Sequence, residues 1–283
     1  MAAILWVLLS TFLWTLIFAA GKFADGGIGA FQLTFLRYCG ALVMLLVLAP
    51  RQGGVRVHRS QQPMIHLARA VSGCGAAVAI TWASANMPLV DATAIGMLYG
   101  VLAILLGTVV LKETVSRTHW VAVIVSLVGV GTVMFGKGAF QGGLSILPAL
   151  VAFTSAAFFA IEGLLISLLG RSERAFTVML YVTFFGVGLM LVPAMLEWQS
   201  ISLRRGVICL LLGPLGLAGQ YCTIRGYRSA PLSVVAPVDY SWLLFSVILG
   251  IIFFQEVPDT GTWIGCFAII LGGVLLARSG GRK

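Results

Sequence analysis

The chain has 283 residues, of which 60% are hydrophobic and only 10% charged, and its formal net charge is +9. Soluble domains carry roughly 25% charged residues, so this composition predicts a polytopic membrane protein surrounded by the lipid bilayer. No segment between the apolar stretches is long enough for a separate soluble catalytic or ATP-binding domain. The positive net charge is explained by its distribution along the chain, described below, and therefore does not indicate nucleic acid as a partner.

Ten apolar stretches follow one another along the chain. A helix needs about 20 apolar residues to cross the hydrocarbon core, and such stretches occupy residues 2–23, 28–50, 64–86, 90–111, 118–136, 143–169, 176–196, 205–225, 232–254 and 261–278. The first has no basic segment before it, which indicates a membrane span rather than a cleaved signal peptide. The sequence therefore predicts an all-α membrane protein with ten transmembrane helices.

Lysine and arginine residues are distributed unequally between the two sides of the membrane. If the N-terminus is cytoplasmic, twelve of the 18 lie in cytoplasmic segments and four on the opposite side, while Arg37 and Arg69 lie within apolar stretches. Cytoplasmic loops of membrane proteins carry an excess of such residues. Both termini are therefore predicted to be cytoplasmic.

The second half of the chain repeats the first at an offset of 143. The residue pairs that coincide are Pro88 with Pro231, Gly107 with Gly250, Glu113 with Glu256, Trp120 with Trp263, and Gly129 with Gly272. The predicted repeats occupy residues 1–137 and 143–283. Because each contains five spans, the second enters the membrane in the opposite orientation, as a 5+5 inverted repeat. Such repeats typically alternate access around a site near the midplane.

Prolines and glutamates at the span ends are candidate hinge or structural residues. Pro88 and Pro231 close opposite faces, and the carboxylates of Glu113 and Glu256 can accept N–H bonds from the start of the next helix. Pro237 lies inside the ninth span, where it removes a backbone hydrogen bond. We expect irregular backbone there, beside a cavity; a kink that only aids packing is the alternative.

Charged residues inside the spans are the first candidates for contact with a substrate. A charge at a helix centre costs roughly 2.5–3.5 kcal/mol, so Glu162, Asp239, Arg37 and Arg69 each need a partner or a water-filled cavity. The acids can contact a cation, a proton or a substrate amine, and an arginine can bind a carboxylate. Structural pairing of acid with base, or arginines reaching an interface, is the alternative.

Aromatic side chains within the spans are the second set. They offer stacking and cation–π surfaces, whereas core packing and interface belts are the alternatives. The full set of substrate-binding candidates is Trp14, Phe18, Trp82, Tyr99, Phe158, Glu162, Tyr221, Asp239, Tyr240, Ser241 and Trp242.

The sequence lacks the patterns of an enzyme or a metal site. It contains neither His-Glu-x-x-His nor Gly-x-Ser-x-Gly, its five cysteines form no Cys-x-x-Cys pair, and its three histidines lie at loop edges. We expect no enzyme activity, no cofactor and no metal. An intramembrane enzyme and a channel are the alternatives from other classes, and ten spans can suffice as a monomer.

Several motifs resemble the EamA family of the drug/metabolite transporter superfamily. The first copy is Leu106-Gly107, Leu111-Lys112-Glu113, Trp120 and Gly129-Val130-Gly131, and the second is Leu249-Gly250, Phe254-Gln255-Glu256, Pro258, Trp263 and Gly272-Gly273. The segment from Ala236 to Ser241 resembles the start of the ninth helix in many bacterial members. In the fourth helix, Tyr99-Gly100-Val101-Leu102-Ala103 replaces the family's proline-containing stretch.

This resemblance implies a carrier of the bacterial inner membrane with a basket-like fold, which moves small metabolites, often outward. Within the family the chain is most similar to YddG-type exporters of aromatic amino acids, so aromatic and neutral amino acids are the expected substrates. Riboflavin, S-adenosylmethionine, nucleotide-type and drug-like solutes remain alternatives.

Overall fold

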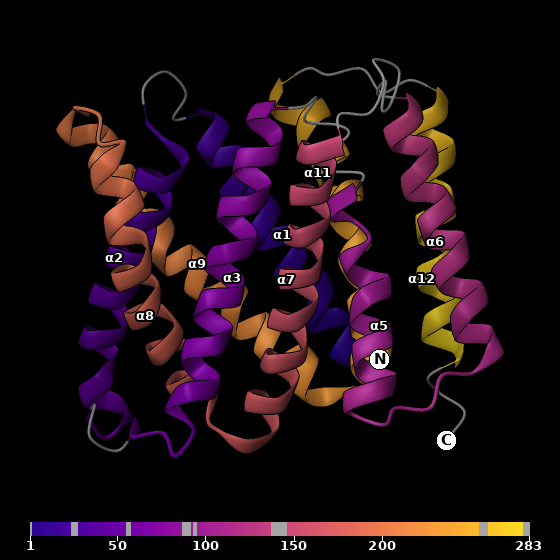
Figure 1. The fold of residues 1–283 in the computed structure, drawn as a ribbon, viewed down its shortest axis with the longest axis horizontal. Coiled ribbons are helices and arrows are strands. Elements are labelled where there is room, and N and C mark those ends of the chain that lie inside the picture. Colours follow the sequence, from indigo (N-terminus) through magenta and orange to yellow (C-terminus); the bar gives the residue numbers. More distant parts are fainter. Residues whose placement is uncertain are drawn as a thin grey trace.

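The computed structural model describes residues 2–23, 28–54, 58–86, 92, 95–136, 146–254 and 260–279 (Figure 1). Within these residues the chain is helical and has no β-strand. The first half contains α1 (Ala2–Phe23), α2 (Ala30–Leu48), η1 (Ala49–Gln52), α3 (Pro63–Asn86), α5 (Tyr99–Val110) and α6 (Arg117–Gly136). The second half contains α7 (Ile146–Ser172), α8 (Ala175–Leu196), α9 (Leu203–Ser229), α10 (Leu232–Val235), η3 (Ala236–Tyr240), α11 (Ser241–Phe254) and α12 (Thr260–Ser279).

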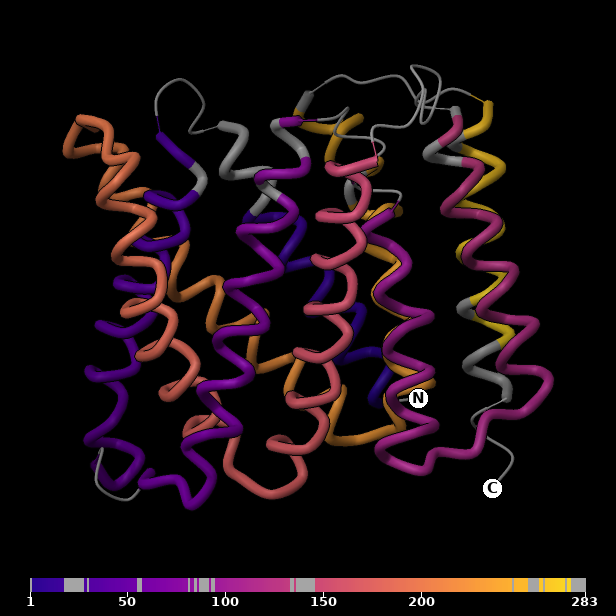
Figure 2. Tube along the Cα trace, viewed as in Figure 1, coloured from indigo at the N-terminus to yellow at the C-terminus, as the bar shows by residue number. Residues whose placement is uncertain are grey.

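The ten predicted spans all coincide with helical segments. Six are long and apolar enough to cross a membrane, and four shorter apolar helices, Ala2–Ile17, Tyr99–Val110, Arg117–Thr132 and Trp263–Gly272, account for the others. The ninth span combines α10, η3 and α11. The start of α1 and the end of α12 lie toward the same edge, as an even number of crossings requires (Figure 1), and Figure 2 traces the same chain path between them. The prediction of an all-α membrane fold is confirmed.

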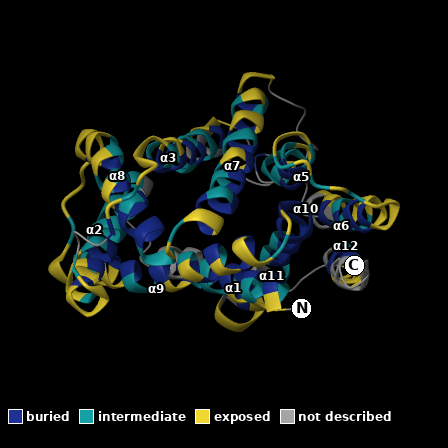
Figure 3. Ribbon diagram, turned by 90° about the horizontal axis from the view of Figure 1, so that it is seen from below, coloured by how far each residue is buried: buried dark blue, intermediate teal, exposed yellow. Residues whose placement is uncertain are grey.

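Seen along the helix axes, the spans form two rows (Figure 3). In the first row α8, α3, α7 and α5 pack in succession, and in the second α2, α9, α1 and α11 do the same. At one end α2 packs on α8, and at the other α6 pairs with α12. The offset of 143 relates α1 to α7, α2 to α8, α3 to α9 and α5 to α11, so it exchanges the two rows. Each row therefore contains two spans from each repeat, and the repeats are interleaved.

The close pairing of α6 with α12 explains one coincidence of the repeat. A Cβ on Gly129 would lie 2.7 Å from the Gly265 carbonyl oxygen, and a Cβ on Gly272 would lie 2.8 Å from the Ala122 carbonyl oxygen. Each glycine of this pair thus faces the backbone of the other helix, where a side chain would force the helices apart. Small residues allow such close packing between membrane helices.

The ninth span is broken where Pro237 lies. After the four residues of α10, the backbone forms the 3₁₀ helix η3, and α11 begins at Ser241. The irregular backbone predicted at Pro237 is present, whereas a role beside a cavity remains a prediction. Pro231 is exposed and caps α10, with its carbonyl oxygen accepting a bond from the Val234 N–H at 3.0 Å.

Glu113 holds the start of this broken span. Its two carboxylate oxygens accept bonds from the backbone N–H groups of Leu232 (2.8 Å) and Ser233 (2.9 Å), and Arg171 Nη2 lies 3.6 Å from Oε1. A carboxylate at a helix start is stabilised by the helix dipole. The helix start that Glu113 bonds is thus that of α10 in the second half and not, as predicted, that of the next helix, α6. Pro88 and Glu256 lie outside the described residues.

Candidate functional site

An arginine from α3 and a glutamate from α7 meet inside the protein. Arg69 Nη2 lies 4.0 Å from Glu162 Oε1. Gly73, one turn after Arg69, leaves the space for this carboxylate, because a Cβ at that position would lie 3.0 Å from Glu162 Oε1. The pairing of α3 with α7 in one row thus brings together two charges that are 93 positions apart in the sequence.

The hydrogen-bonding capacity of Arg69 is unused. Its side chain is 0% exposed, and its three guanidinium nitrogens make no hydrogen bond to any described residue. A guanidinium offers five N–H donors, and hydrogen-bonded ion pairs bring nitrogen and oxygen to about 2.7–2.9 Å. Glu162, whose side chain is 21% exposed, is therefore a nearby counter-charge that does not satisfy these donors.

A second arginine faces this pair from the other row. The Arg37 guanidinium carbon lies 5.0 Å from the centre of the Trp14 ring and 5.5 Å from that of Tyr38, within the range of cation–π attraction. Glu162 interacts electrostatically with both arginines. We call Arg37, Arg69 and Glu162 the arginine cluster. It has two cations and one anion, and so one positive charge in excess.

A separate group of polar side chains surrounds Asp239 on η3. The Tyr227 hydroxyl of α9 donates a hydrogen bond of 2.5 Å to Asp239 Oδ2, and Tyr99 of α5 interacts electrostatically with the same carboxylate. The Tyr99 and Tyr240 rings pack edge to face at 6.3 Å. We call Asp239, Tyr99, Tyr227 and Tyr240 the aspartate cluster, a carboxylate held by phenol groups.

The two clusters are neighbours across α7. The Tyr227 ring packs on this helix at Gly163, where a Cβ would lie 3.3 Å from Tyr227 Cε1, and Tyr227 interacts electrostatically with Glu162. Phenylalanines on α7 extend the same surface. The Phe159 ring packs edge to face on Tyr99 at 6.2 Å, and Phe158 packs against α3 at Gly75. The aspartate cluster and the arginine cluster thus both lie beside the aromatic side chains of α7.

The structure distributes the predicted site residues unevenly. Trp14, Tyr99, Phe158, Glu162, Asp239 and Tyr240 belong to the two clusters or to their aromatic surroundings. Ser241 is buried and its hydroxyl bonds that of Thr11 at 2.9 Å, which joins α11 to α1.

Other predicted residues belong to neither cluster. Trp82 is 41% exposed, and Trp242 packs against an apolar group that includes Tyr240, Leu243 and Ile269, so it borders the aspartate cluster. Tyr221, 38% exposed, packs edge to face on Trp6 at 6.0 Å. The side chain of Phe18 falls outside the described part. The roles of these residues remain predictions.

Tyr227 was not among the predicted site residues, although the sequence carried a signal for it. At the offset of 143 it corresponds to Ser84, so this position is aromatic in only one repeat. Asp239, whose counterpart at this offset is Gly96, shows the same kind of asymmetry. Tyr227 was missed because it lies in the last turn of α9, where it was not considered part of a span.

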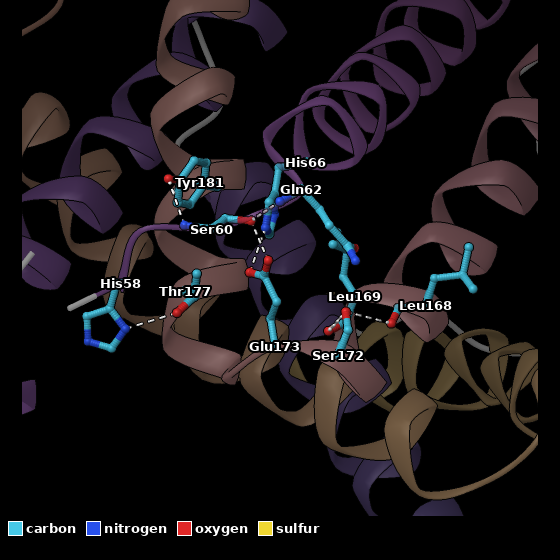
Figure 4. A network of polar contacts seen from close by, with 10 residues as sticks. All are labelled: His58, Ser60, Gln62, His66, Leu168, Leu169, Ser172, Glu173, Thr177 and Tyr181. Carbon is cyan, nitrogen blue, oxygen red and sulfur yellow. Dashed lines mark hydrogen bonds and ion pairs between the residues drawn. The ribbon is translucent and has the colours of Figure 1, made fainter. Parts of the chain in front are cut away.

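A second polar network, also missed, joins the start of α3 to the turn between α7 and α8 (Figure 4). Glu173 accepts a hydrogen bond from the Ser60 hydroxyl through one oxygen and contacts His66 Nε2 at 2.8 Å through the other. The Tyr181 hydroxyl accepts a bond from the Ser60 N–H at 3.1 Å, and the His66 ring stacks on Tyr181 at 4.6 Å. We call these four residues the junction network.

An open groove of about 790 Å³ lies on the α2–α8 side, apart from the arginine and aspartate clusters. It is lined by Leu42, Leu46, His58, Arg59, Leu180, Tyr181 and Phe184. Most of these side chains are apolar, as expected for a surface between membrane helices. Its polar lining residues are His58, Arg59 and Tyr181, and Tyr181 belongs to the junction network.

Comparison with known proteins gives a consistent result. The EamA-like transporter family matches residues 1–135 and 146–278. The pseudopaline exporter CntI of Pseudomonas aeruginosa is 28% identical over 98% of this chain and 96% of its own. The riboflavin transporter of Vibrio cholerae is 24% identical over 94% and 90%. A solved crystal structure superposes with a TM-score of 0.84 at 18% identity, covering 99% of both chains, which supports the fold.

Proposed function

Because the chain belongs to the EamA-like transporter family, we propose that it exports amino acids or amino-acid-derived solutes, with aromatic and neutral amino acids as the first candidates. Family membership makes it a multi-pass membrane transporter of a small molecule and not an enzyme. The proposal places it in a bacterial inner membrane, as a monomer with both termini in the cytoplasm. The lysine and arginine distribution and the export function named for the Pseudomonas relative support this orientation and direction.

The observation that carries the proposal is the buried guanidinium of Arg69, whose donors make no hydrogen bond to any described residue. A solute carboxylate would accept hydrogen bonds from Arg69 and neutralise the excess positive charge of the arginine cluster. A solute amine would find Glu162 within the same group. The nearby rings of Trp14, Phe158 and Phe159 offer a surface on which an aromatic solute side chain can stack.

Charge neutralisation also gives a reason for alternating access. Removing an unpaired ion from water carries an effective penalty of several kcal/mol, so a closed state that buries the arginine cluster is disfavoured without an anion. A bound carboxylate lowers this penalty and therefore favours closure of the two rows around the solute. A ligand shifts a conformational equilibrium by its difference in affinity for the two states, and here that difference arises from the buried charge.

The test is counterflow of labelled phenylalanine into proteoliposomes containing the full-length protein. Competing solutes are tryptophan, leucine, riboflavin, S-adenosylmethionine, and two analogues of phenylalanine, phenethylamine without the carboxylate and phenylpropionate without the amine. We expect amino acids to compete, and phenethylamine to compete far more weakly than phenylpropionate because Arg69 binds the carboxylate.

Two outcomes would count against this function. Equal competition by phenethylamine and phenylpropionate would remove the arginine cluster from solute recognition. If riboflavin or S-adenosylmethionine competes but no amino acid does, the transport function stands and the proposed substrate class is wrong.

A further inference from the structure

We propose that Asp239 is a proton-binding site and that its protonation couples inward proton movement to outward movement of the solute. The proposal rests on the proposed carrier function for its transport step. The proton-binding step does not depend on the carrier function and is argued from the geometry of the aspartate cluster.

The two intramembrane carboxylates have opposite surroundings. Glu162 is accompanied by Arg69 and Arg37, which favour its ionised form. In the described part of the chain, the Tyr227 hydroxyl donates a hydrogen bond to Asp239, and no lysine, arginine or histidine forms an ion pair with it. An intramembrane carboxylate without a counter-cation is a natural site for a proton, because protonation removes its charge.

The elements around Asp239 supply no other charge that could replace the proton. Tyr99 faces it from α5, Tyr227 from α9 and Tyr240 from η3 itself, and Glu162 on α7 reaches the group only through Tyr227. The helices α1, α6, α10, α11 and α12 also pack against η3 or continue it. None of their described side chains contributes a charge to Asp239.

The position of Asp239 allows its protonation to affect the conformation. It lies on the 3₁₀ segment that interrupts the ninth span in one row, and Tyr99, whose ring packs on that of the adjacent Tyr240, lies at the start of α5 in the other row. The ionised carboxylate accepts a hydrogen bond from Tyr227 and interacts electrostatically with Tyr99, and so links the rows. Protonation turns one carboxylate oxygen into a donor and weakens this connection, since a carboxylic acid accepts fewer bonds.

The coupling then follows from alternate access to one carboxylate. When the rows open outward, the solute leaves and Asp239 takes up a proton to form the carboxylic acid. When they open inward, the acid releases the proton and the carboxylate interacts with the tyrosines again. Each cycle moves a proton inward and a solute outward, with no covalent step other than the transfer of the proton.

The first experiment needs no solute. The purified full-length protein in lipid nanodiscs is treated with dicyclohexylcarbodiimide, which reacts with protonated carboxyl groups in apolar surroundings, and the modified peptides are identified by mass spectrometry. We expect modification of Asp239 that increases as the pH is lowered, and none of Glu162, which serves as the internal control. Modification of Glu162 without Asp239, or of neither at any pH, would overturn the proposal.

Tyr227→Phe gives a finer readout with the same reagent. A hydrogen bond to the ionised form of a carboxylate favours that form, so removing the Tyr227 hydroxyl should shift the onset of Asp239 modification to higher pH. Tyr221→Phe, on the same helix but in contact with Trp6, is the matched control and should leave the onset unchanged. An unchanged onset in Tyr227→Phe would show that the cluster does not control the proton.

The second experiment compares proteoliposome accumulation of labelled phenylalanine with and without a proton gradient. We expect the gradient to drive accumulation by the wild-type protein and to have no effect on Asp239→Asn. If wild-type counterflow is present but the gradient changes nothing, the coupling is wrong and the carrier function stands. If no solute of the panel undergoes counterflow, the carrier function fails, and carbodiimide modification alone decides whether Asp239 binds a proton.

Discussion

The junction network and the arginine cluster each contain a partly buried acid and a fully buried base, yet they join them differently. In the junction network both oxygens of Glu173 are bonded, one by Ser60 and one by His66 Nε2, while His66 Nδ1 has no hydrogen-bond partner among the described residues. In the arginine cluster, Glu162 and Arg69 remain 4.0 Å apart and the guanidinium makes no hydrogen bond to a described residue. The first acid and base are thus directly hydrogen-bonded to each other, whereas the second pair leaves all the guanidinium donors available to a solute.

The junction network and the arginine cluster also share a position of the internal repeat. Tyr38 and Tyr181 are equivalent at the offset of 143. Tyr181 stacks on His66 in the junction network, and Tyr38 lies 5.5 Å from the Arg37 guanidinium. One position of the repeat thus supports a closed structural network in one half and a charged, incompletely bonded group in the other. The difference suggests that function is found where a repeated scaffold position has unrepeated polar neighbours.

Arg69→Gln should have the largest effect and tests the open side of the comparison. Loss of a buried hydrogen-bonded charge commonly weakens binding by about 2–5 kcal/mol, so we expect phenylalanine counterflow to fall by about 100-fold. Because the guanidinium makes no internal hydrogen bond, the melting temperature should not fall. Arg225→Gln, whose charge lies over Trp6, is the control, and a loss of stability without a loss of transport would make Arg69 a structural residue.

Glu173→Gln tests the closed side and should show the reverse pattern. Replacing a partner of buried polar groups costs about 1–3 kcal/mol, because Ser60 and His66 lose their charged acceptor. We expect a lower melting temperature, measured by the fluorescence of purified protein, with counterflow per folded molecule retained. Stability equal to wild type together with loss of transport would move the junction network into the transport mechanism.

Glu113→Ala should have a smaller effect on stability. Loss of a helix cap costs about 0.5–2 kcal/mol, and this substitution leaves the N–H groups of Leu232 and Ser233 without their acceptor. We expect a modest fall in melting temperature. Glu113→Gln keeps an acceptor oxygen, so its melting temperature should lie between those of the wild-type protein and Glu113→Ala. Identical melting temperatures for all three proteins would contradict the capping role.

Trp14→Leu should give the smallest change and refines the arginine cluster. Cation–π contacts contribute about 0.5–2 kcal/mol, so we expect a several-fold rise in the solute concentration needed for half-maximal counterflow as Arg37 loses its fixed position. Trp6→Leu removes the equivalent contact with Arg225 and should leave this concentration unchanged. Equal effects of both substitutions would indicate general packing.

Local and periodic features of this protein could be predicted from its sequence. Hydrophobicity located the spans, the offset identified Gly129 and Gly272 before their contact between α6 and α12 was known, and proline chemistry located the break at Pro237. Glu162 and Asp239 stood out because charges are rare inside spans. Each of these inferences depends on a residue and its near neighbours or on its repeat partner.

The pairing of the charged residues could not be predicted in the same way. Which base approaches Glu162 depends on the packing of α3 against α7, and the contact of His66 with Glu173 joins residues 107 positions apart. The rotation of each helix also decides which side chains face inward. This is why Tyr221 packs on Trp6 and not in either cluster, although its residue type suited a binding site.

The interleaving of the repeats has a consequence for how the protein is made. During synthesis the first five spans enter the membrane before α7 and α9 exist, so neither row can be completed by the first half alone. Until α7 arrives, Arg69 lacks the carboxylate that lies beside it in the finished protein. The first half must therefore remain in the bilayer with the unpaired charge of Arg69 until the second half is inserted. The helices of the second half then complete both rows, so the first half reaches its final packing only after they arrive.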